Sequence, residues 1–181
     1  KLNIGIVDLD TSHPQNWIPI IRDLGHEFSG VWDGGSVHPA SYVETFAKEN
    51  GIPEVCDTLD NLVERSDAAI IHACDWDTHV DKARPFIEAG KGVLIDKPLA
   101  GKVKDLNQLQ AWADDGARIV GGSSLRFCLE TQNWLKQSVQ ERGMPNTVVC
   151  GCGVDEFNYG IHAYSMMAGI LGAGASSVRH L

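Results

Sequence analysis

The stretch LNIGIVDLDTSHP, from Leu2 to Pro14, decides the start of the fold. Its first six residues form a short apolar run, which is typical of a strand buried on both faces of a parallel sheet. A helix is expected from Pro14 to Leu24, with Ser12 and Gln15 as a capping box at its start. The stretch therefore predicts a strand, a polar turn and a helix in close succession.

The same alternation of strand and helix continues along the chain to about residue 122. Strands are expected at 26–33, 54–56, 68–74, 93–95 and 118–120, and helices at 41–50, 59–64, 79–89 and 103–115. Thr78 is expected to cap the helix that begins at His79. Because the connections are short, the pattern predicts a parallel sheet wound by right-handed crossovers. Residues 1–122 are therefore predicted to form a Rossmann-type, doubly wound α/β domain.

The pattern changes in residues 123–181. One helix is expected at 130–142, a single strand at 147–152 and an apolar helix at 160–171. One strand cannot satisfy the hydrogen-bonding groups on both of its edges. We therefore expect this region to begin a second, α+β domain with an open sheet, whose remainder is absent from this sequence.

Composition excludes some classes of partner. The 181 residues are 43% hydrophobic and 22% charged, with a net charge of −9, which argues against nucleic acid and against an anionic membrane surface. No apolar segment approaches the roughly 18 residues of a membrane span, and no signal peptide is recognised. The cysteines are odd in number, which favours reduced thiols and a cytoplasmic location. They are Cys56, Cys74, Cys128, Cys150 and Cys152.

The middle of the chain carries several motifs in sequence. From Ser66 to Ala100 it is SDAAIIHACDWDTHVDKARPFIEAGKGVLIDKPLA, with Thr78-His79, then Glu88-Ala89-Gly90-Lys91, then Asp96-Lys97-Pro98. This resembles the oxidoreductase family of glucose–fructose oxidoreductase and inositol dehydrogenase (Gfo/Idh/MocA), which has Glu-Lys-Pro at the last of these positions. The chain resembles a divergent member of that family, because its glycine-rich loop is degenerate.

The resemblance implies an activity and a quaternary structure. Family members have a Rossmann domain followed by a second α/β domain, and their chains are considerably longer than this one. The resemblance implies transfer of a hydride between NAD(H) and a secondary alcohol carbon of a small molecule such as a sugar or polyol. It also implies a homo-oligomer that associates through the open sheet of the second domain.

Three residues are expected to act on the substrate, by resemblance to the family. Lys97 follows a parallel strand, where open α/β sheets place their ligands, and its ammonium group would stabilise a developing alkoxide. Asn158-Tyr159-Gly160-Ile161-His162 resembles a family segment whose histidine exchanges the substrate proton. This chain has Asn158 where the family commonly has aspartate, and asparagine cannot take a proton.

Other residues are expected to contact the cofactor. Asp33 lies 25 positions after Asp8 and resembles the acidic residue that binds the adenosine ribose, which favours NAD over NADP. Asp75 and Trp76 replace the family segment beside the nicotinamide ribose, and the indole would either stack on a cofactor or fill its place. His79 and Lys97 are the remaining candidates on this side.

The phosphate-binding loop departs most from the family. Its three glycine positions are occupied by Asp8, Asp10 and His13, and the carboxylates add bulk and negative charge where a pyrophosphate would bind. Thr11, Ser12, the first-turn amides and a protonated His13 would still offer donors to phosphate.

Three hypotheses follow from this loop. In the first, a cofactor binds in an altered pose and the protein is a sugar-type dehydrogenase. In the second, NAD no longer binds and the protein is a non-catalytic binding or structural relative. In the third, Asp8, Asp10 and His13 hold a metal or polar ligand. We favour the first, because Lys97, His162 and Asp33 are retained, and we expect no metal.

Overall fold

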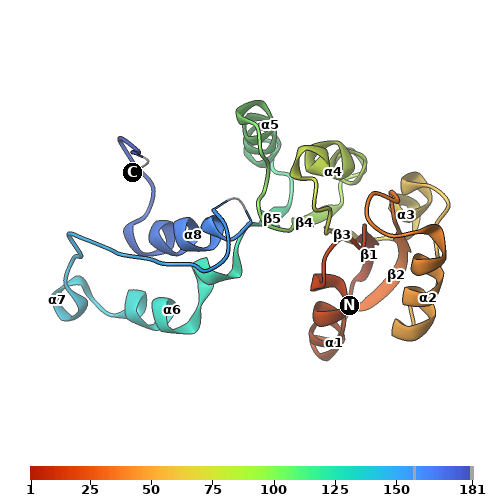
Figure 1. Ribbon diagram of the computed structural model, residues 1–181, viewed down its shortest axis with the longest axis horizontal. Helices are drawn as coiled ribbons and strands as arrows, with labels where there is room; N and C mark the ends of the chain where they lie inside the picture. The colour runs from red at the N-terminus through yellow and green to blue at the C-terminus, as the bar shows by residue number, and fades with distance from the viewer. Residues whose placement is uncertain (157, 180–181) are drawn as a thin grey trace. The chain divides into compact units, whose positions relative to one another are not determined.

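The computed structural model describes residues 1–156 and 158–179 and separates into two compact units, Lys1–Gly121 and Gly122–Leu181. The first unit contains one five-stranded parallel sheet in the order β2-β1-β3-β4-β5 (Figure 1). The strands are β1 (Asn3–Val7), β2 (Glu27–Trp32), β3 (Ala68–Ile71), β4 (Gly92–Ile95) and β5 (Ile119–Gly121). The helices are α1 (His13–Asp23), α2 (Ala40–Asn50), α3 (Leu59–Arg65), α4 (His79–Glu88) and α5 (Val103–Asp114), with a 3₁₀ turn η1 (Trp76–Thr78).

Helices cover both faces of this sheet. Val7, Ile71 and Ile95 pack with α3, α4 and α5 in one apolar cluster. On the other face Ile6 and Ile70 pack with α1 and α2 in a second cluster. Successive strand side chains therefore alternate between two cores, as expected for a sheet buried on both faces. The predicted Rossmann-type doubly wound fold is confirmed.

The strand order creates a switch point beside β1. The chain leaves β1 for β2 on one side and continues from β3 to β5 on the other. Open α/β sheets bind ligands at the carboxyl ends of the strands at such a point. In the ladder Val7 pairs with Ile71, and Ile71 pairs with Ile95. The residues that follow these three therefore lie in one row at the edge of the sheet.

Three local predictions for the first unit are wrong. Residues 54–56 form only an isolated bridge, Val31 to Val55, because so short a segment adds no full strand. Ser12 makes no side-chain capping bond, because it has a helical backbone (φ −78°, ψ −1°) rather than the extended one that capping requires. Thr78 is also helical and does not cap; its hydroxyl donates to the Asp75 carbonyl instead.

The regular elements of the second unit are all helices in its described residues. The expected helix at 130–142 is interrupted at Gln137, where Ser138 and Glu141 form a capping box that starts a new helix. The expected strand at 147–152 is wrong, since no partner strand is available to pair with it in the described part of this unit. The elements are η2 (Ser124–Phe127), α6 (Leu129–Lys136), α7 (Val139–Arg142) and α8 (Gly160–Leu171). Within the described residues, no helix combines the length and apolar character needed to cross a bilayer.

Gly121 at the end of β5 provides a test of the packing between β5 and the end of β4. A Cβ atom there would lie 2.3 Å from the Ile95 carbonyl oxygen and 2.6 Å from Leu99 Cδ2. Because the nearest atom belongs to the backbone, we expect Gly121→Ala to lower the free energy of unfolding by about 2 kcal/mol. Urea denaturation measures this, and Gly92→Ala is the matched strand control, since its nearest neighbour would be an ordinary 3.7 Å away. An equal, small effect of both substitutions would contradict the prediction.

Candidate functional site

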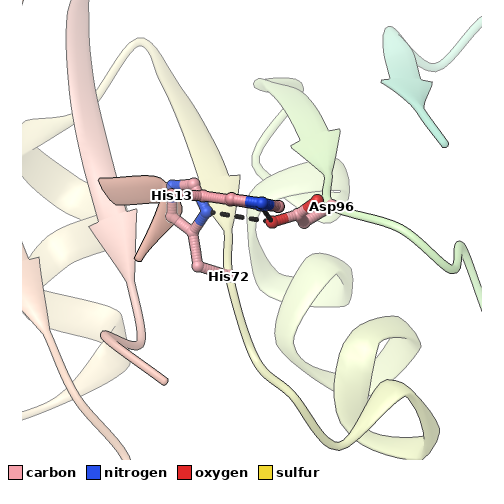
Figure 2. Close-up of side chains that lie close together, drawn as sticks. All are labelled: His13, His72 and Asp96. Carbon is pink, nitrogen blue, oxygen red and sulfur yellow. Dashed lines mark hydrogen bonds and ion pairs between the residues drawn. The ribbon is translucent and has the colours of Figure 1, made fainter. Parts of the chain in front are cut away.

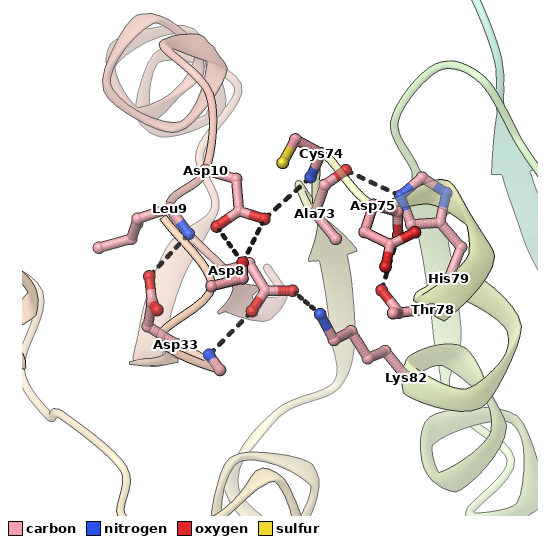
Figure 3. Close-up of polar contacts among 12 residues, drawn as sticks. Asp8, Leu9, Asp10, Asp33, Ala73, Cys74, Asp75, Thr78, His79 and Lys82 are labelled. Atoms are coloured by element: carbon pink, nitrogen blue, oxygen red, sulfur yellow. Dashed lines mark hydrogen bonds and ion pairs between the residues drawn. The ribbon is translucent and has the colours of Figure 1, made fainter. Parts of the chain in front are cut away.

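Asp8 adopts the backbone conformation that glycine usually supplies at this turn. Its φ is +64°, in the left-handed region that few residues other than glycine enter. Its side chain is fully buried, and one carboxylate oxygen accepts a hydrogen bond from the Gly34 amide (2.9 Å). The other oxygen lies 2.6 Å from Lys82 Nζ of α4 (Figure 3). The positive φ thus turns the carboxylate into the protein and toward α4.

The Asp8–Lys82 ion pair is largely buried. Only 15% of the Lys82 side chain is exposed, and its ammonium group also lies 6.0 Å from the centre of the Trp32 ring. Burial raises the pKa of the Asp8 carboxyl above its ordinary value, and Lys82 only partly offsets this effect. Lys82 therefore supplies the charge that allows a carboxylate at the first glycine position.

Asp10 connects three loops at the same edge of the sheet. Its carboxylate accepts a hydrogen bond from the Cys74 amide (2.9 Å), three residues after the end of β3 (Figure 3), and one from the Ser36 hydroxyl (3.0 Å), after β2. Single carboxylate oxygens of Asp8, Asp10 and Asp33 lie within 4.8 Å of one another. This places a concentration of negative charge around the loop.

Asp33 lies at the end of β2 and is held by backbone amides. One oxygen accepts from Leu9 in the loop (3.0 Å), and the other accepts from Gly35 (2.6 Å). The side chain is partly exposed. The predicted ribose-binding residue is therefore oriented by two hydrogen bonds beside the turn that follows β1.

His13 lies in a different group, with His72 and Asp96 (Figure 2). His13 Nδ1 contacts Asp96 Oδ2 directly, and His72 Nδ1 is 3.4 Å from the same oxygen. Burial raises the pKa of Asp96, but the two imidazoles outweigh it and hold that pKa well below its ordinary value. Burial also lowers the pKa of His72. The hypothesised set Asp8, Asp10 and His13 is not the one that the fold assembles.

The residues that follow β3, from Asp75 to His79, form hydrogen bonds and packing contacts with neighbouring parts of the first unit. Asp75 accepts from the Asp77 amide (3.1 Å) and is exposed. The Trp76 indole lies against Gly101, where a Cβ atom would come within 2.3 Å of the ring. His79 is fully buried, with Nε2 2.9 Å from the Ala73 carbonyl and Nδ1 3.2 Å from the Leu99 carbonyl. These contacts support a structural role for His79.

Lys97 and the residues at the start of α1 also lie at the carboxyl ends of the strands. The Lys97 amide donates to Asp96 Oδ1 (2.7 Å), and the residue is partly exposed at the end of β4. The Thr11 hydroxyl oxygen accepts from the His13 amide (3.2 Å), so the donor that this bond occupies is a first-turn amide expected to serve a phosphate and not the Thr11 O–H. Ser12 is exposed.

In the second unit the two predicted catalytic residues have separate partners. His162 Nδ1 lies 2.7 Å from the Ser123 hydroxyl, near the start of α8. The Asn158 side-chain amide donates to the Asp155 carboxylate (3.2 and 3.3 Å). Asn158 and His162 are therefore hydrogen-bonded to different residues, Asp155 and Ser123.

Two important residues, His72 and Lys82, were missed by sequence reasoning. A signal for His72 was present, because it follows β3 with the same side-chain parity as Ile70, which faces α1. Asp96 has the same relation to Leu94, which also packs against that cluster. Lys82 gave no comparable signal, since its role depends on the backbone angle of Asp8.

The fold and these motifs can be compared with known proteins. The family model described as "Oxidoreductase family, NAD-binding Rossmann fold" (GFO_IDH_MocA) matches residues 3–122. The chain is 31% identical over 113 residues to the putative oxidoreductase YceM of Salmonella typhimurium, covering 62% of the chain and 35% of that protein. It is 24% identical over 148 residues to 1,5-anhydro-D-fructose reductase of Ensifer adhaerens, covering 81% and 40%.

A solved structure agrees at the level of the fold. GenD2 from gentamicin A biosynthesis, solved in complex with NAD, superposes with a TM-score of 0.71 at 19% identity, over 95% of this chain and 54% of GenD2. The chain thus spans only about a third to a half of the length of these relatives. Because the matched model covers most of the first unit and more than half of the sequence, the chain belongs to the Gfo/Idh/MocA oxidoreductase family, which has an NAD-binding Rossmann fold.

Proposed function

We propose that the complete protein transfers a hydride between NAD(H) and a secondary alcohol carbon of a sugar, polyol or similar polar metabolite. The observation that carries this proposal is the positive φ of Asp8, because it preserves the glycine-type turn while the carboxylate is buried against Lys82. The sugar-related substrate class is supported by the name of the Ensifer relative, 1,5-anhydro-D-fructose reductase.

The edge of the sheet fits a dinucleotide in its backbone shape. The turn after β1 is retained, and Asp33 offers a carboxylate at the position that binds an adenosine ribose in Rossmann domains. The charge of Asp8 is compensated from within the protein, so it adds little to the repulsion of a phosphate. Asp10 is the residue that fits least, since within the described residues its carboxylate forms hydrogen bonds but no ion pair with a lysine or arginine.

Different side chains of the protein would then bind the cofactor and act on the substrate. A bound NAD(H) supplies or accepts the hydride at its nicotinamide. Asp33 would hold the ribose, and its negative charge would repel the negatively charged 2′-phosphate of NADP, so NAD is the proposed cofactor. Lys97 would donate a hydrogen bond to the reacting oxygen and stabilise its negative charge. His162 would exchange the substrate proton, as imidazole does near neutral pH.

The second candidate is a cofactor-free relative of the same fold. It is favoured by the two hydrogen bonds that Asp10 makes across the loops after β2 and β3. If these bonds persist, they keep a carboxylate at the position where a pyrophosphate approaches the backbone. The five free cysteines fit a reducing compartment, and we propose the cytoplasm for either candidate.

Calorimetric titration of the complete protein with NADH and NADPH tests the proposal. We expect micromolar binding of NADH, weaker binding of NADPH, and a loss of NADH affinity in Asp33→Ala. Asp10→Gly should bind NADH about fivefold more tightly, because removing one nearby carboxylate is worth on the order of 1 kcal/mol.

The control for that variant is Asp10→Asn, which removes the charge but keeps the bulk. An equal gain in both variants identifies charge as the obstacle, and a gain in glycine alone identifies bulk. Absence of heat with either nucleotide at millimolar concentration, in the parent and in Asp10→Gly, would establish the cofactor-free candidate.

A further inference from the structure

We propose that His13, His72 and Asp96 form a binding site for a divalent transition-metal ion, with Zn²⁺ as the ion that suits the donors. The three residues come from α1 and from the residues that follow β3 and β4 (Figure 2). Two imidazole nitrogens and one carboxylate oxygen are a donor set that zinc accepts, and they leave a coordination position for water or a substrate oxygen. The proposal does not rest on the proposed nucleotide binding.

The sheet brings the three side chains together. The His72 amide donates to the Val7 carbonyl (2.9 Å), and the Asp96 amide donates to the Ile71 carbonyl (3.0 Å). The two residues therefore extend the ladder by one row beyond Val7, Ile71 and Ile95. Strand alternation directs both side chains away from α4 and toward α1, where His13 begins the helix.

The spacing of the donor atoms suits a small ion. One donor atom from each residue lies within 4.8 Å of the other two. Tetrahedral zinc, with bonds of about 2.0–2.1 Å, separates its ligand atoms by about 3.4 Å. His72 Nδ1 and Asp96 Oδ2 are already 3.4 Å apart, and His13 Nδ1 contacts the same oxygen. Each imidazole therefore presents its own Nδ1 atom to the same carboxylate oxygen, Oδ2 of Asp96.

The three donor side chains differ in their exposure to solvent. The side chains of His72 and Asp96 are 1% and 4% exposed, whereas that of His13 is 32% exposed. The two inner donors are therefore held by the core, and the outer imidazole lies on the side from which an ion can enter. The contact between His13 and Asp96 is the one that would have to open for an ion to lie between the donors.

Surrounding contacts orient the donors. The Trp17 ring stacks on His13 with centroids 5.5 Å apart and an interplanar angle of 6°, and it makes a T-shaped contact with His72, with centroids 5.2 Å apart. The second oxygen of Asp96 accepts from the Lys97 amide (2.7 Å). Outer contacts of this kind fix ligand orientation in metal sites.

A hydrogen-bonded triad without an ion is the competing arrangement. In the described part of the chain, Asp96 forms ion pairs only with the two imidazoles. The Asp96 carboxylate is buried, which is costly unless positive charge beside it compensates the negative charge. A divalent ion compensates this charge while using donors that already converge.

The test is calorimetric titration of the chelator-treated complete protein with Zn²⁺ at neutral pH, without nucleotide. We expect one ion per chain with a micromolar or lower dissociation constant. His13→Ala and Asp96→Asn should weaken binding about tenfold or more. His38→Ala is the matched control, because this imidazole stacks on Tyr42 (centroids 4.0 Å apart) as His13 stacks on Trp17, and it should leave binding unchanged.

Titration with Co²⁺ identifies the donor atoms. Binding through nitrogen and oxygen gives visible absorption bands without the intense near-ultraviolet band of thiolate ligation, so the cysteines are distinguished from the proposed site. Circular dichroism verifies that each variant is folded, and His13→Gln, which preserves bulk, replaces His13→Ala if the latter does not fold. Lack of saturable binding, binding unchanged by His13 and Asp96 substitutions, or a thiolate band would each overturn the proposal.

Discussion

Replacing Lys82 by methionine is expected to lower the free energy of unfolding by about 3 kcal/mol or more. In the parent protein Lys82 Nζ lies 2.6 Å from the Asp8 carboxylate. The substitution preserves most of the apolar stem of the lysine but leaves this fully buried carboxylate without its cation. Urea denaturation of the complete protein measures the loss. Lys104→Met, at an exposed position of α5, is the control and should change stability by less than about 0.5 kcal/mol.

The destabilisation should depend on pH in a defined direction. Burial already raises the pKa of Asp8, and removing Lys82 removes the main effects that lower it. Above the raised folded-state pKa the variant must bury an unpaired charge. As the pH falls through that pKa the carboxyl is protonated in the folded state, so the loss relative to the parent protein shrinks. A loss that is the same at all pH values would mean that packing, not charge, is responsible.

The double variant Asp8→Gly with Lys82→Met should recover most of the stability. It removes both charges and places glycine at φ +64°, where glycine is favoured. We expect it to lie within about 1 kcal/mol of the parent, because an ion pair can be replaced by apolar groups at little cost. A double variant as unstable as Lys82→Met alone would show that the two side chains are not coupled.

Lys97→Met is expected to lower kcat/KM by about 10²- to 10³-fold, a loss that corresponds to one stabilising donor at a developing oxyanion. This prediction rests on the proposed function. Lys97 is partly exposed after β4, so its loss should not unfold the protein. The measurement is steady-state oxidation of the secondary alcohol that the complete protein accepts, with kcat and KM determined separately.

NADH titration of the same variant separates chemistry from cofactor binding. If Lys97 acts on the reacting oxygen, kcat falls while the affinity for NADH changes little. Lys104→Met again serves as the control and should retain full activity. A reduction below tenfold in Lys97→Met, or a fall confined to NADH affinity, would remove Lys97 from the proposed role.

Much of the fold could be predicted because its signals are local. Short apolar runs alternating with amphipathic segments predicted the five strands and the helices of the first unit, with small errors at their ends. The errors arose where pairing partners decide the outcome. Residues 54–56 form a single bridge to β2, and 147–152 have no partner strand among the described residues. A strand is stabilised by a neighbour, which a periodic pattern does not reveal.

The candidate site also has features that are local in the sequence and features that depend on the tertiary structure. The sequence alone determined that polar residues follow β1, β2 and β4, including Asp8, Asp33 and Lys97, because position after an apolar run is a local property. Only the tertiary structure decided which side chains meet. The positive φ of Asp8 turns it toward Lys82, 74 positions away in the sequence. Strand order and register bring His72 and Asp96 to His13, because contacts between distant segments depend on how the strands are arranged, and that arrangement is a property of the whole sheet.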